Sequence, residues 1–273
     1  MTPIPSQEHQ HPIIVKLANT ILSTWEATLD LSPYNLPEDL GYVEGKLEGE
    51  RLTIENRCFQ TPQFRKLHLE LAKVGNSLNI LHCVMFPRPN FDLPMFGCDL
   101  VGGRGQISAA IADLSPVKAE LPSEYQSKLE PWLKRQDEFS QQRELPKWGN
   151  IFSPYCLFVR PIGSEEEDLF LETTAEYLKL HCLRAKASQP VDRAQEADLL
   201  AGQQRYCNRQ QQNDKTRRVL EKAFGKQWTD RYITTVLFDS PQDAANSEVA
   251  PSERNDTSPQ PSEVSANETS SNA

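Results

Sequence analysis

Residues 64–113 carry an alternation of apolar and polar side chains that constrains the fold more than any other stretch of the chain. The order in residues 67–71 is Leu-His-Leu-Glu-Leu, and the same period of two returns in residues 78–86. A period of two is typical of β-strands, because successive side chains of a strand point to opposite faces of a sheet. Turns containing glycine or asparagine separate the segments, so we predict an antiparallel meander with one strongly apolar face.

The midpoints of these turns predict which residues lie opposite each other. The first turn and the connection that follows it place Glu70 and Asp99 on either side of His82. The midpoint of the next, glycine-rich turn places Ser108 opposite Asp99. Directly opposed Cβ atoms in such a sheet lie about 4.5–5.5 Å apart. We therefore expect one row of side chains across a sheet face: Glu70, His82, Asp99 and Ser108.

A histidine between two carboxylates is costly to bury unless it faces solvent, a ligand or a substrate. The carboxylates favour protonated His82, so we expect its pKa to lie above the usual value and the three groups to titrate together. Such a cluster can transfer protons near neutral pH. The residues alone leave two other interpretations open: a polar sheet face in contact with solvent, and a metal site formed by His68, Glu70 and His82.

A second polar group stands at residues 213–218, which read Asn-Asp-Lys-Thr-Arg-Arg at the start of the last predicted helix. In the ordinary interpretation Asn213 or Asp214 caps the helix and the basic side chains face solvent. In the functional interpretation Asn213 and Asp214 face a cleft and Lys215 binds an anion. Arg143 is a further candidate anion ligand, because a guanidinium group binds a carboxylate through two hydrogen bonds.

The rest of the sequence predicts an α+β fold. Helices are predicted in five segments: residues 11–29, 123–139, 165–185, 194–211 and 213–238. Apolar side chains recur at helical spacing in the first, second and last of these, a capping box precedes the third, and the fourth is polar. Short strands extend the meander in three others: residues 41–47, 51–58 and 155–160. Because the strands come first and most helices follow, we predict a three-layer α/β/α sandwich with a central, mostly antiparallel sheet of about seven strands.

Composition divides the chain into three parts. The 273 residues have a net charge of −9, of which residues 240–273, with six acidic side chains and one basic one, carry −5. This segment is so poor in apolar side chains that burial cannot offset its conformational entropy. We therefore predict a flexible arm at residues 1–10, one folded domain at residues 11–239 and a disordered acidic tail at residues 240–273.

Several classes of function are not indicated. The sequence has no stretch apolar and long enough for a membrane span and no secretory signal. Its six cysteines form no Cys-x-x-Cys pair, so we expect free thiols in a cytoplasmic protein rather than a zinc or redox motif. It has neither a nucleotide-binding motif nor a basic stretch interleaved with aromatic residues, so we expect no bound nucleotide or flavin and no nucleic-acid partner. We expect a monomer.

Four blocks of sequence stand out when they are taken together: Tyr-Asn-Leu-Pro-Glu-Asp-Leu-Gly-Tyr in residues 34–42, Leu-His-Cys-Val-Met-Phe-Pro in residues 81–87, Ala-Asp-Leu-Ser-Pro in residues 112–116 and Asn-Asp-Lys-Thr-Arg-Arg in residues 213–218. With the shorter blocks between them, they resemble the ferredoxin-dependent bilin reductases over residues 12–239. The agreement of many separate blocks makes this resemblance far more specific than any single motif.

The resemblance implies that biliverdin IXα binds between the sheet and the C-terminal helices and is reduced without a permanently bound metal or flavin. Reduced ferredoxin, which carries its own [2Fe–2S] cluster, would donate electrons one at a time through bilin radicals, and the product would be phycocyanobilin. Two alternatives stay open: a family member that makes another bilin, such as a phycoerythrobilin, and a bilin carrier without catalytic activity.

The resemblance also implies a role for each candidate residue. Three would supply protons to the bilin: Glu70, His82 and Asp99. Five would bind it, at its propionates or along the walls of the site: Ser108, Arg143, Asn213, Asp214 and Lys215.

Overall fold

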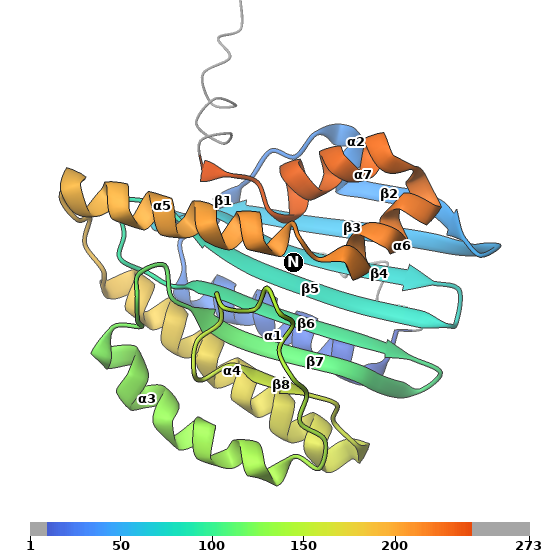
Figure 1. The fold of residues 1–273 in the computed structure, drawn as a ribbon, viewed down its shortest axis with the longest axis horizontal. Coiled ribbons are helices and arrows are strands. Elements are labelled where there is room, and N and C mark those ends of the chain that lie inside the picture. The colour runs from blue at the N-terminus through green and yellow to red at the C-terminus, as the bar shows by residue number, and fades with distance from the viewer. Residues whose placement is uncertain (1–9, 242–273) are drawn as a thin grey trace, which may run out of the picture.

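The computed structural model describes residues 10–241 (Figure 1). The predicted arm, residues 1–10, and the predicted acidic tail, residues 240–273, lie outside the described residues except for Gln10, Ser240 and Pro241. Within residues 10–241, no helix combines the length and the apolar character that a membrane span requires. All six cysteines are described, and all are free thiols.

A central antiparallel sheet forms the middle layer, as the alternation of side chains predicted. Its strands are β1 (Ser32–Pro33), β2 (Tyr42–Leu47), β3 (Glu50–Gln60), β4 (Phe64–Val74), β5 (Leu78–Pro87), β6 (Met95–Gly103), β7 (Gln106–Ser115) and β8 (Leu157–Val159). The spatial order is β1-β3-β4-β5-β6-β7-β8, and β2 pairs with the same edge of β3 as β1 does. The sheet therefore contains the seven expected strands plus the two-residue strand β1.

The helices lie close to the predicted segments. They are α1 (Pro12–Thr28), α2 (Glu38–Gly41), α3 (Ser123–Lys134), α4 (Gly163–Ala187), α5 (Arg193–Gln210), α6 (Asp214–Phe224) and α7 (Lys226–Tyr232), with a 3-10 turn at Arg135–Glu138 and a π-helical turn at Ile233–Leu237. The prediction of one continuous helix over residues 213–238 was wrong. Gly225 has a φ of 81°, which ends α6 and begins α7, because glycine adopts this left-handed region without a steric cost.

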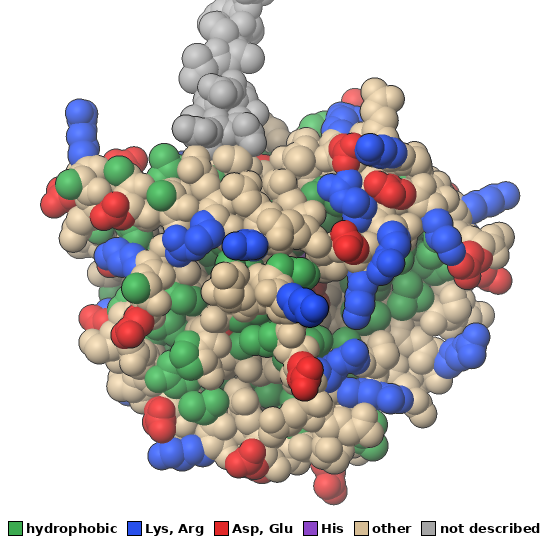
Figure 2. Space-filling model, viewed as in Figure 1, with side chains coloured by type: hydrophobic (Ala, Val, Ile, Leu, Met, Phe, Trp, Pro, Cys, Tyr) green, Lys and Arg blue, Asp and Glu red, His purple; other side chains and the backbone are tan. Residues whose placement is uncertain are grey.

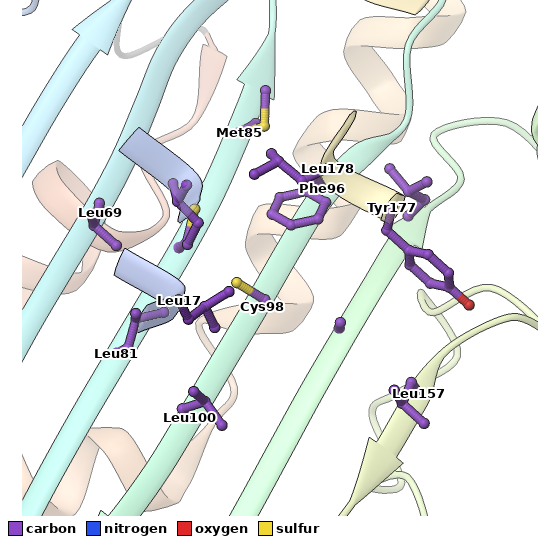
Figure 3. Packing of buried hydrophobic residues seen from close by; sticks show 14 of the residues in the cluster. Leu17, Leu69, Leu81, Met85, Phe96, Cys98, Leu100, Leu157, Tyr177 and Leu178 are labelled. Atoms are coloured by element: carbon purple, nitrogen blue, oxygen red, sulfur yellow. The ribbon is translucent and has the colours of Figure 1, made fainter. Parts of the chain in front are cut away.

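The helices cover both faces of the sheet and complete the predicted α/β/α sandwich (Figure 1). On one face, α1, α3 and α4 pack on the apolar side chains of the central strands. Figure 3 shows this layer, in which Leu69, Leu81 and Leu100 from three neighbouring strands lie near Leu17 of α1, while Tyr177 of α4 lies toward Leu157 of β8. On the other face, α5, α6 and α7 cover a second apolar cluster, which surrounds the polar row.

A buried ionic cluster fastens the end of the described chain to β4. The Lys66 side chain is 0 % exposed; its Nζ donates to the carbonyl oxygen of Val236 at 2.7 Å and contacts the Asp239 carboxylate. Arg65 Nη2 donates to the Asp239 carbonyl oxygen at 2.8 Å, and its Nη1 contacts the carboxylate. Burial alone raises the pKa of Asp239, but the two cations outweigh it and lower the pKa. This cluster holds the segment after α7 over the sheet.

The close approach of α5 to the segment that follows β7 depends on Gly202. A Cβ atom built at this position would overlap the carbonyl oxygen of Val117, in the segment that follows β7. Because the clash is with backbone, the helix itself would have to move. We expect Gly202→Ala to lower the free energy of unfolding by about 1–3 kcal/mol, measured by urea denaturation.

Gly41→Ala is the matched control, because a Cβ atom at Gly41 meets nothing within 4 Å. We expect it to change the free energy of unfolding by less than about 0.5 kcal/mol. Equal stability of the two variants would contradict the proposed role of Gly202.

Candidate active site

The register between β4, β5 and β6 brings three of the predicted residues into one row. Glu70 on β4 lies opposite His82 on β5, and His82 lies opposite Asp99 on β6. Both pairings are as the turn midpoints predicted. The row lies on the sheet face that α5, α6 and α7 cover.

The prediction that Ser108 continues this row was wrong, because Asp99 lies opposite Ile111. The hairpin between β6 and β7 turns through two residues, Arg104 and Gly105, whose φ angles are 53° and 76°. A register shift between Val101 and Gly102 displaces the strands further. Ser108 therefore lies near the hairpin, exposed, where its Oγ donates to the Val101 carbonyl oxygen at 3.0 Å. A turn midpoint could not predict this result, because a β-bulge adds a residue to one strand alone.

His82 and Asp99 form the most direct contact of the row. His82 Nδ1 lies 2.6 Å from Asp99 Oδ1, and the His82 side chain is 11 % exposed, whereas that of Asp99 is 43 % exposed. Burial by itself lowers the pKa of His82, but the Asp99 carboxylate outweighs this effect and raises the pKa. His82 Nε2 is buried and has no hydrogen-bond partner among the described residues.

Glu70 and His68 are buried more deeply and make separate contacts. Glu70 Oε2 lies 2.5 Å from the hydroxyl oxygen of Tyr232, and burial raises the pKa of this carboxyl. His68 Nε2 lies 2.8 Å from Asn56 Oδ1, and burial holds the pKa of His68 well below its usual value. Among residues 10–241, no group of three His, Cys, Asp or Glu side chains is placed to hold a metal ion, so the geometry does not favour a facial triad of His68, Glu70 and His82.

Half-buried apolar side chains surround Asp99 on the sheet. They lie on the same face, in pairs that the register aligns: Ile80 with Val101, Val101 with Ala109, and Ile111 with Phe158. Figure 2 shows hydrophobic side chains gathered at the centre of this face, below α5. An apolar floor with one accessible carboxylate suits a flat, mostly apolar molecule whose polar atoms meet Asp99.

The predicted anion ligands fall into two groups. Arg143 lies beside the floor, where its guanidinium carbon is 5.3 Å from the centre of the Phe158 ring and its Nη1 donates to the Ser108 carbonyl oxygen. Asn213 caps α6, because its Oδ1 accepts a hydrogen bond from the Lys215 backbone at 3.2 Å. The structure therefore joins Arg143 to Ser108, whereas the side-chain hydrogen bond of Asn213 stays within the first turn of α6.

Asp214 and Lys215 are exposed. The ordinary interpretation of residues 213–218 as a helix cap is thus correct for Asn213, and a role of these side chains in binding stays a prediction.

Tyr232 and Asn56 are members of the site that the sequence reasoning missed. Asn56 lies opposite Glu70 on the neighbouring strand β3. Extending the turn-midpoint argument by one hairpin would have missed it, because the midpoint of the connection between β3 and β4 places Ile54 opposite Glu70. Tyr232 comes from α7, 162 residues along the chain from Glu70. No local pattern marks Tyr232, because only the packing of α7 on the sheet brings its hydroxyl to Glu70.

A cavity of about 980 Å³ lies elsewhere, between the segment after β7, the loop before β8 and α5. None of the predicted site residues lines it, and its charged side chains are Lys118, Glu120, Asp198 and Arg205. We place the candidate active site at the polar row instead, because there buried titratable groups meet an accessible apolar floor.

Comparison with known proteins identifies the family of this chain. The sequence model of a family described as "Ferredoxin-dependent bilin reductase" matches residues 18–239. The chain belongs to the ferredoxin-dependent bilin reductase family. The resemblance seen in the sequence is thereby confirmed, and it spans every element that carries the row.

This bilin reductase has close relatives named phycocyanobilin:ferredoxin oxidoreductase. The relative from Trichodesmium erythraeum (strain IMS101) is 57 % identical over 243 residues, which cover 88 % of this chain and 98 % of the relative. The relative from Gloeobacter violaceus (strain ATCC 29082 / PCC 7421) is 57 % identical over 233 residues, covering 85 % and 92 %. The relative from Synechococcus elongatus (strain ATCC 33912 / PCC 7942 / FACHB-805) is 56 % identical over 246 residues, covering 89 % and 98 %.

A solved structure supports the fold of this bilin reductase. Phytochromobilin synthase from tomato, in a crystal structure with biliverdin, superposes with a TM-score of 0.74 over 84 % of each chain. The two sequences are 19 % identical. At this identity the likeness concerns the fold, and it matches the predicted three-layer sandwich.

The raised pKa of His82 gives a testable consequence. Asp99→Asn removes the carboxylate that holds the His82 proton while burial remains, so we expect the pKa of His82 to fall, as measured by NMR titration of the imidazole in the ligand-free protein. Asp92→Asn is the control, because Asp92 pairs with Lys118 instead. An unchanged pKa of His82 in Asp99→Asn would contradict the pairing.

The same pair links stability to pH. A raised pKa means that the folded protein holds the His82 proton more tightly than the unfolded chain does, so the pair stabilises the fold below the ordinary histidine value of 6.5. This stabilisation is lost as the pH rises through the folded-state pKa of His82. We expect Asp99→Asn to lack the stabilising contribution of the pair at low pH.

Proposed function

We propose that this bilin reductase converts biliverdin IXα into phycocyanobilin, with electrons from reduced ferredoxin and protons from its own side chains. The observation that carries the proposal is the His82–Asp99 pair on an accessible apolar sheet face, in a chain whose close relatives carry that activity in their names. The proposal needs no cofactor bound permanently to this chain. We also propose a cytoplasmic monomer, since free thiols persist in a reducing compartment.

The proposed chemistry adds hydrogen across two double bonds, first at the outer vinyl group and then in the A-ring. Each reduction consumes two electrons and two protons, and ferredoxin delivers the electrons singly, so bilin radicals form between steps. Asp99 faces the pyrrole nitrogens or lactam oxygens and helps to protonate the bilin. A protonated bilin accepts an electron more readily, because the added negative charge is neutralised at once.

His82 and Glu70 replenish these protons in the proposed mechanism. The 2.6 Å contact between His82 Nδ1 and Asp99 Oδ1 is short enough for direct proton transfer. Glu70, whose pKa is raised by burial, is an acid of the right kind for delivery near neutral pH toward the vinyl-bearing end. Glu70 and His82 each shift the pKa of the other, so a pH–rate profile reports both groups together rather than one residue.

The bilin propionates need cationic or hydrogen-bonding partners at the rim of the floor. Arg143 is suited to one of them, because its exposed guanidinium lies beside Phe158 and Ser108. Lys215 is the proposed cation on the α6 side, with Asn213 and Asp214 lining the site there. These assignments go with the proposed substrate.

Ferredoxin docking is proposed at the basic side chains near α6, which Figure 2 shows along the right-hand side of the face. Arg217 contacts Asp230 and lies 3.7 Å from Glu221, so its charge is compensated within the protein. Arg218 is exposed, and no ion pair of the described residues involves it. Arg218 is therefore the better candidate for an acidic partner.

One assay tests the proposed function. Purified protein receives biliverdin IXα and a ferredoxin-reducing system, and the absorption spectrum is followed to completion. We expect phycocyanobilin. A phycoerythrobilin-type spectrum would show that the protein makes a different bilin. Binding of biliverdin without any reduction would indicate a carrier.

Asp99→Asn tests the mechanism within this assay. The variant keeps the shape of the side chain but has no carboxylate, so we expect it to bind biliverdin and to stop at a one-electron-reduced radical that electron paramagnetic resonance detects. Asp92→Asn serves as the control and should turn over normally. Normal turnover by Asp99→Asn would remove Asp99 from the catalytic residues.

Arg218→Glu tests the docking surface. Reversing this charge should raise the KM for ferredoxin and weaken the dependence of the rate on ionic strength, because one attractive pair becomes repulsive. Lys128→Glu, on the exposed surface of α3, makes the same charge change on the opposite side of the sheet and should leave this KM unchanged. A wild-type rate that is insensitive to salt would argue against electrostatic docking.

A further inference from the structure

A chain of buried hydrogen bonds connects Glu70 to His68 without passing through His82. The Tyr232 hydroxyl oxygen lies 2.5 Å from Glu70 Oε2 and 3.0 Å from Asn56 Oδ1. Asn56 Oδ1 lies 2.8 Å from His68 Nε2, and Asn56 Nδ2 donates to the Leu40 carbonyl oxygen at 2.8 Å. All four members of the chain are buried.

The Leu40 carbonyl determines how Asn56 is oriented. A carbonyl oxygen only accepts hydrogen bonds, so the amide nitrogen of Asn56 must face Leu40 and its Oδ1 must face the other two partners. Since Oδ1 is also only an acceptor, His68 has to donate through Nε2–H. His68 is neutral in this environment, which leaves Nδ1 as a bare acceptor with no partner among residues 10–241.

Counting hydrogens then determines the state of Glu70. The Tyr232 hydroxyl has one hydrogen, and an ionised Glu70 would only accept. Two acceptors, Asn56 Oδ1 and the carboxylate, would then compete for that hydrogen, and one short buried contact would hold none. If Glu70 is protonated, it donates to Tyr232, and Tyr232 donates to Asn56. Every contact then holds one hydrogen, which is the arrangement that burial favours.

We propose that Tyr232 and Asn56 are positioning residues for the reduction: the Tyr232 hydroxyl accepts the hydrogen bond of a neutral Glu70 carboxylic acid, and Asn56 holds His68 as the Nε2–H tautomer. Glu70, beside His82, then carries the proton that it donates before any bilin binds. The link to reduction rests on the proposed function, whereas the two protonation states are properties of the ligand-free protein.

Rigid parts of the fold hold Tyr232 and Asn56 in place. The Tyr232 ring stacks on Trp228, with centroids 4.7 Å apart and an interplanar angle of 13°, and Trp228 packs on Phe224 at 4.2 Å. Asn56 is held by the pairing of β3 with β4.

Burial favours the same protonation states, because it raises the pKa of Glu70 and lowers that of His68. The other titratable groups that face the chain are Cys58 on β3, Lys66 on β4, His82 on β5 and Asp99 on β6.

Infrared spectroscopy of the ligand-free protein at neutral pH tests the state of Glu70. We expect the wild type to show a protonated-carboxyl band that disappears in Glu70→Gln. In Tyr232→Phe, which keeps the stacked ring, this band should persist and move to higher frequency, because the acid loses its acceptor. Absence of the band in the wild type, with its appearance in Tyr232→Phe, would mean that Tyr232 donates to an ionised Glu70 and would overturn the proposal.

Tyr177→Phe is the matched control. It removes the hydroxyl of another buried tyrosine, which donates to the Tyr155 carbonyl oxygen at 2.9 Å on the opposite side of the sheet. We expect it to leave the Glu70 band unchanged. A shift of the same size in Tyr177→Phe would attribute the effect to general loosening and contradict the proposal.

Nitrogen-15 NMR of the wild-type imidazoles tests the state of His68 without relying on a variant for the result. We expect a proton on Nε2, a bare Nδ1 and no charging at neutral pH. Asn56→Leu, which has a similar volume but no acceptor, should remove the preference for Nε2–H. An Nδ1–H tautomer or an imidazolium ion at His68 in the wild type would overturn the assignment of Asn56.

Turnover supplies the functional readout. We expect Tyr232→Phe to reduce biliverdin roughly tenfold more slowly, the effect of losing one hydrogen bond to the proton donor, with its affinity for biliverdin unchanged. An unchanged rate would mean that the hydrogen bonds of Tyr232 do not contribute to the reduction. Because the infrared and NMR results need no bilin, they stand even if the proposed substrate is wrong.

Discussion

The alternation of side chains across the central sheet is the constraint on which the rest of the structure depends. A strand presents every second residue to the same face, so the register of two hairpins is enough to bring Glu70, His82 and Asp99 together. The same alternation sends the leucines of these strands to the opposite face, where α1, α3 and α4 bury them. The face that carries the polar row can hold these groups because the other face carries much of the apolar core.

Environment then gives similar side chains different properties. His68 and His82 lie on one sheet face with ring centroids 5.6 Å apart, yet burial lowers the pKa of His68 while Asp99 raises that of His82. Glu70 is buried beside Tyr232, whereas Asp99 is half-exposed on an apolar floor. Neighbouring side chains on one sheet face therefore differ in burial and in the direction of their pKa shifts.

The helices on the face that carries the polar row add Tyr232 to it and also cover it. The buried cluster of Arg65, Lys66 and Asp239 anchors the segment after α7, and Phe238 in this segment lies edge-on to His82 with centroids 5.5 Å apart. Removing one member of such a cluster would leave a buried charge unpaired, which costs far more than a surface ion pair contributes. The same helices therefore position Tyr232 and limit the access of solvent to His82.

Local patterns in the sequence by themselves determined the strands, most helix boundaries and the register that joins Glu70, His82 and Asp99. Period and turn length act over a few residues, so they can be read without the fold. Tertiary structure alone decided the rest. A β-bulge and a two-residue turn moved Ser108 away from Asp99, and Gly225 divided the last helix. The packing of α7 brought Tyr232 to Glu70 across 162 residues. Such contacts depend on how whole elements pack, which no short pattern encodes.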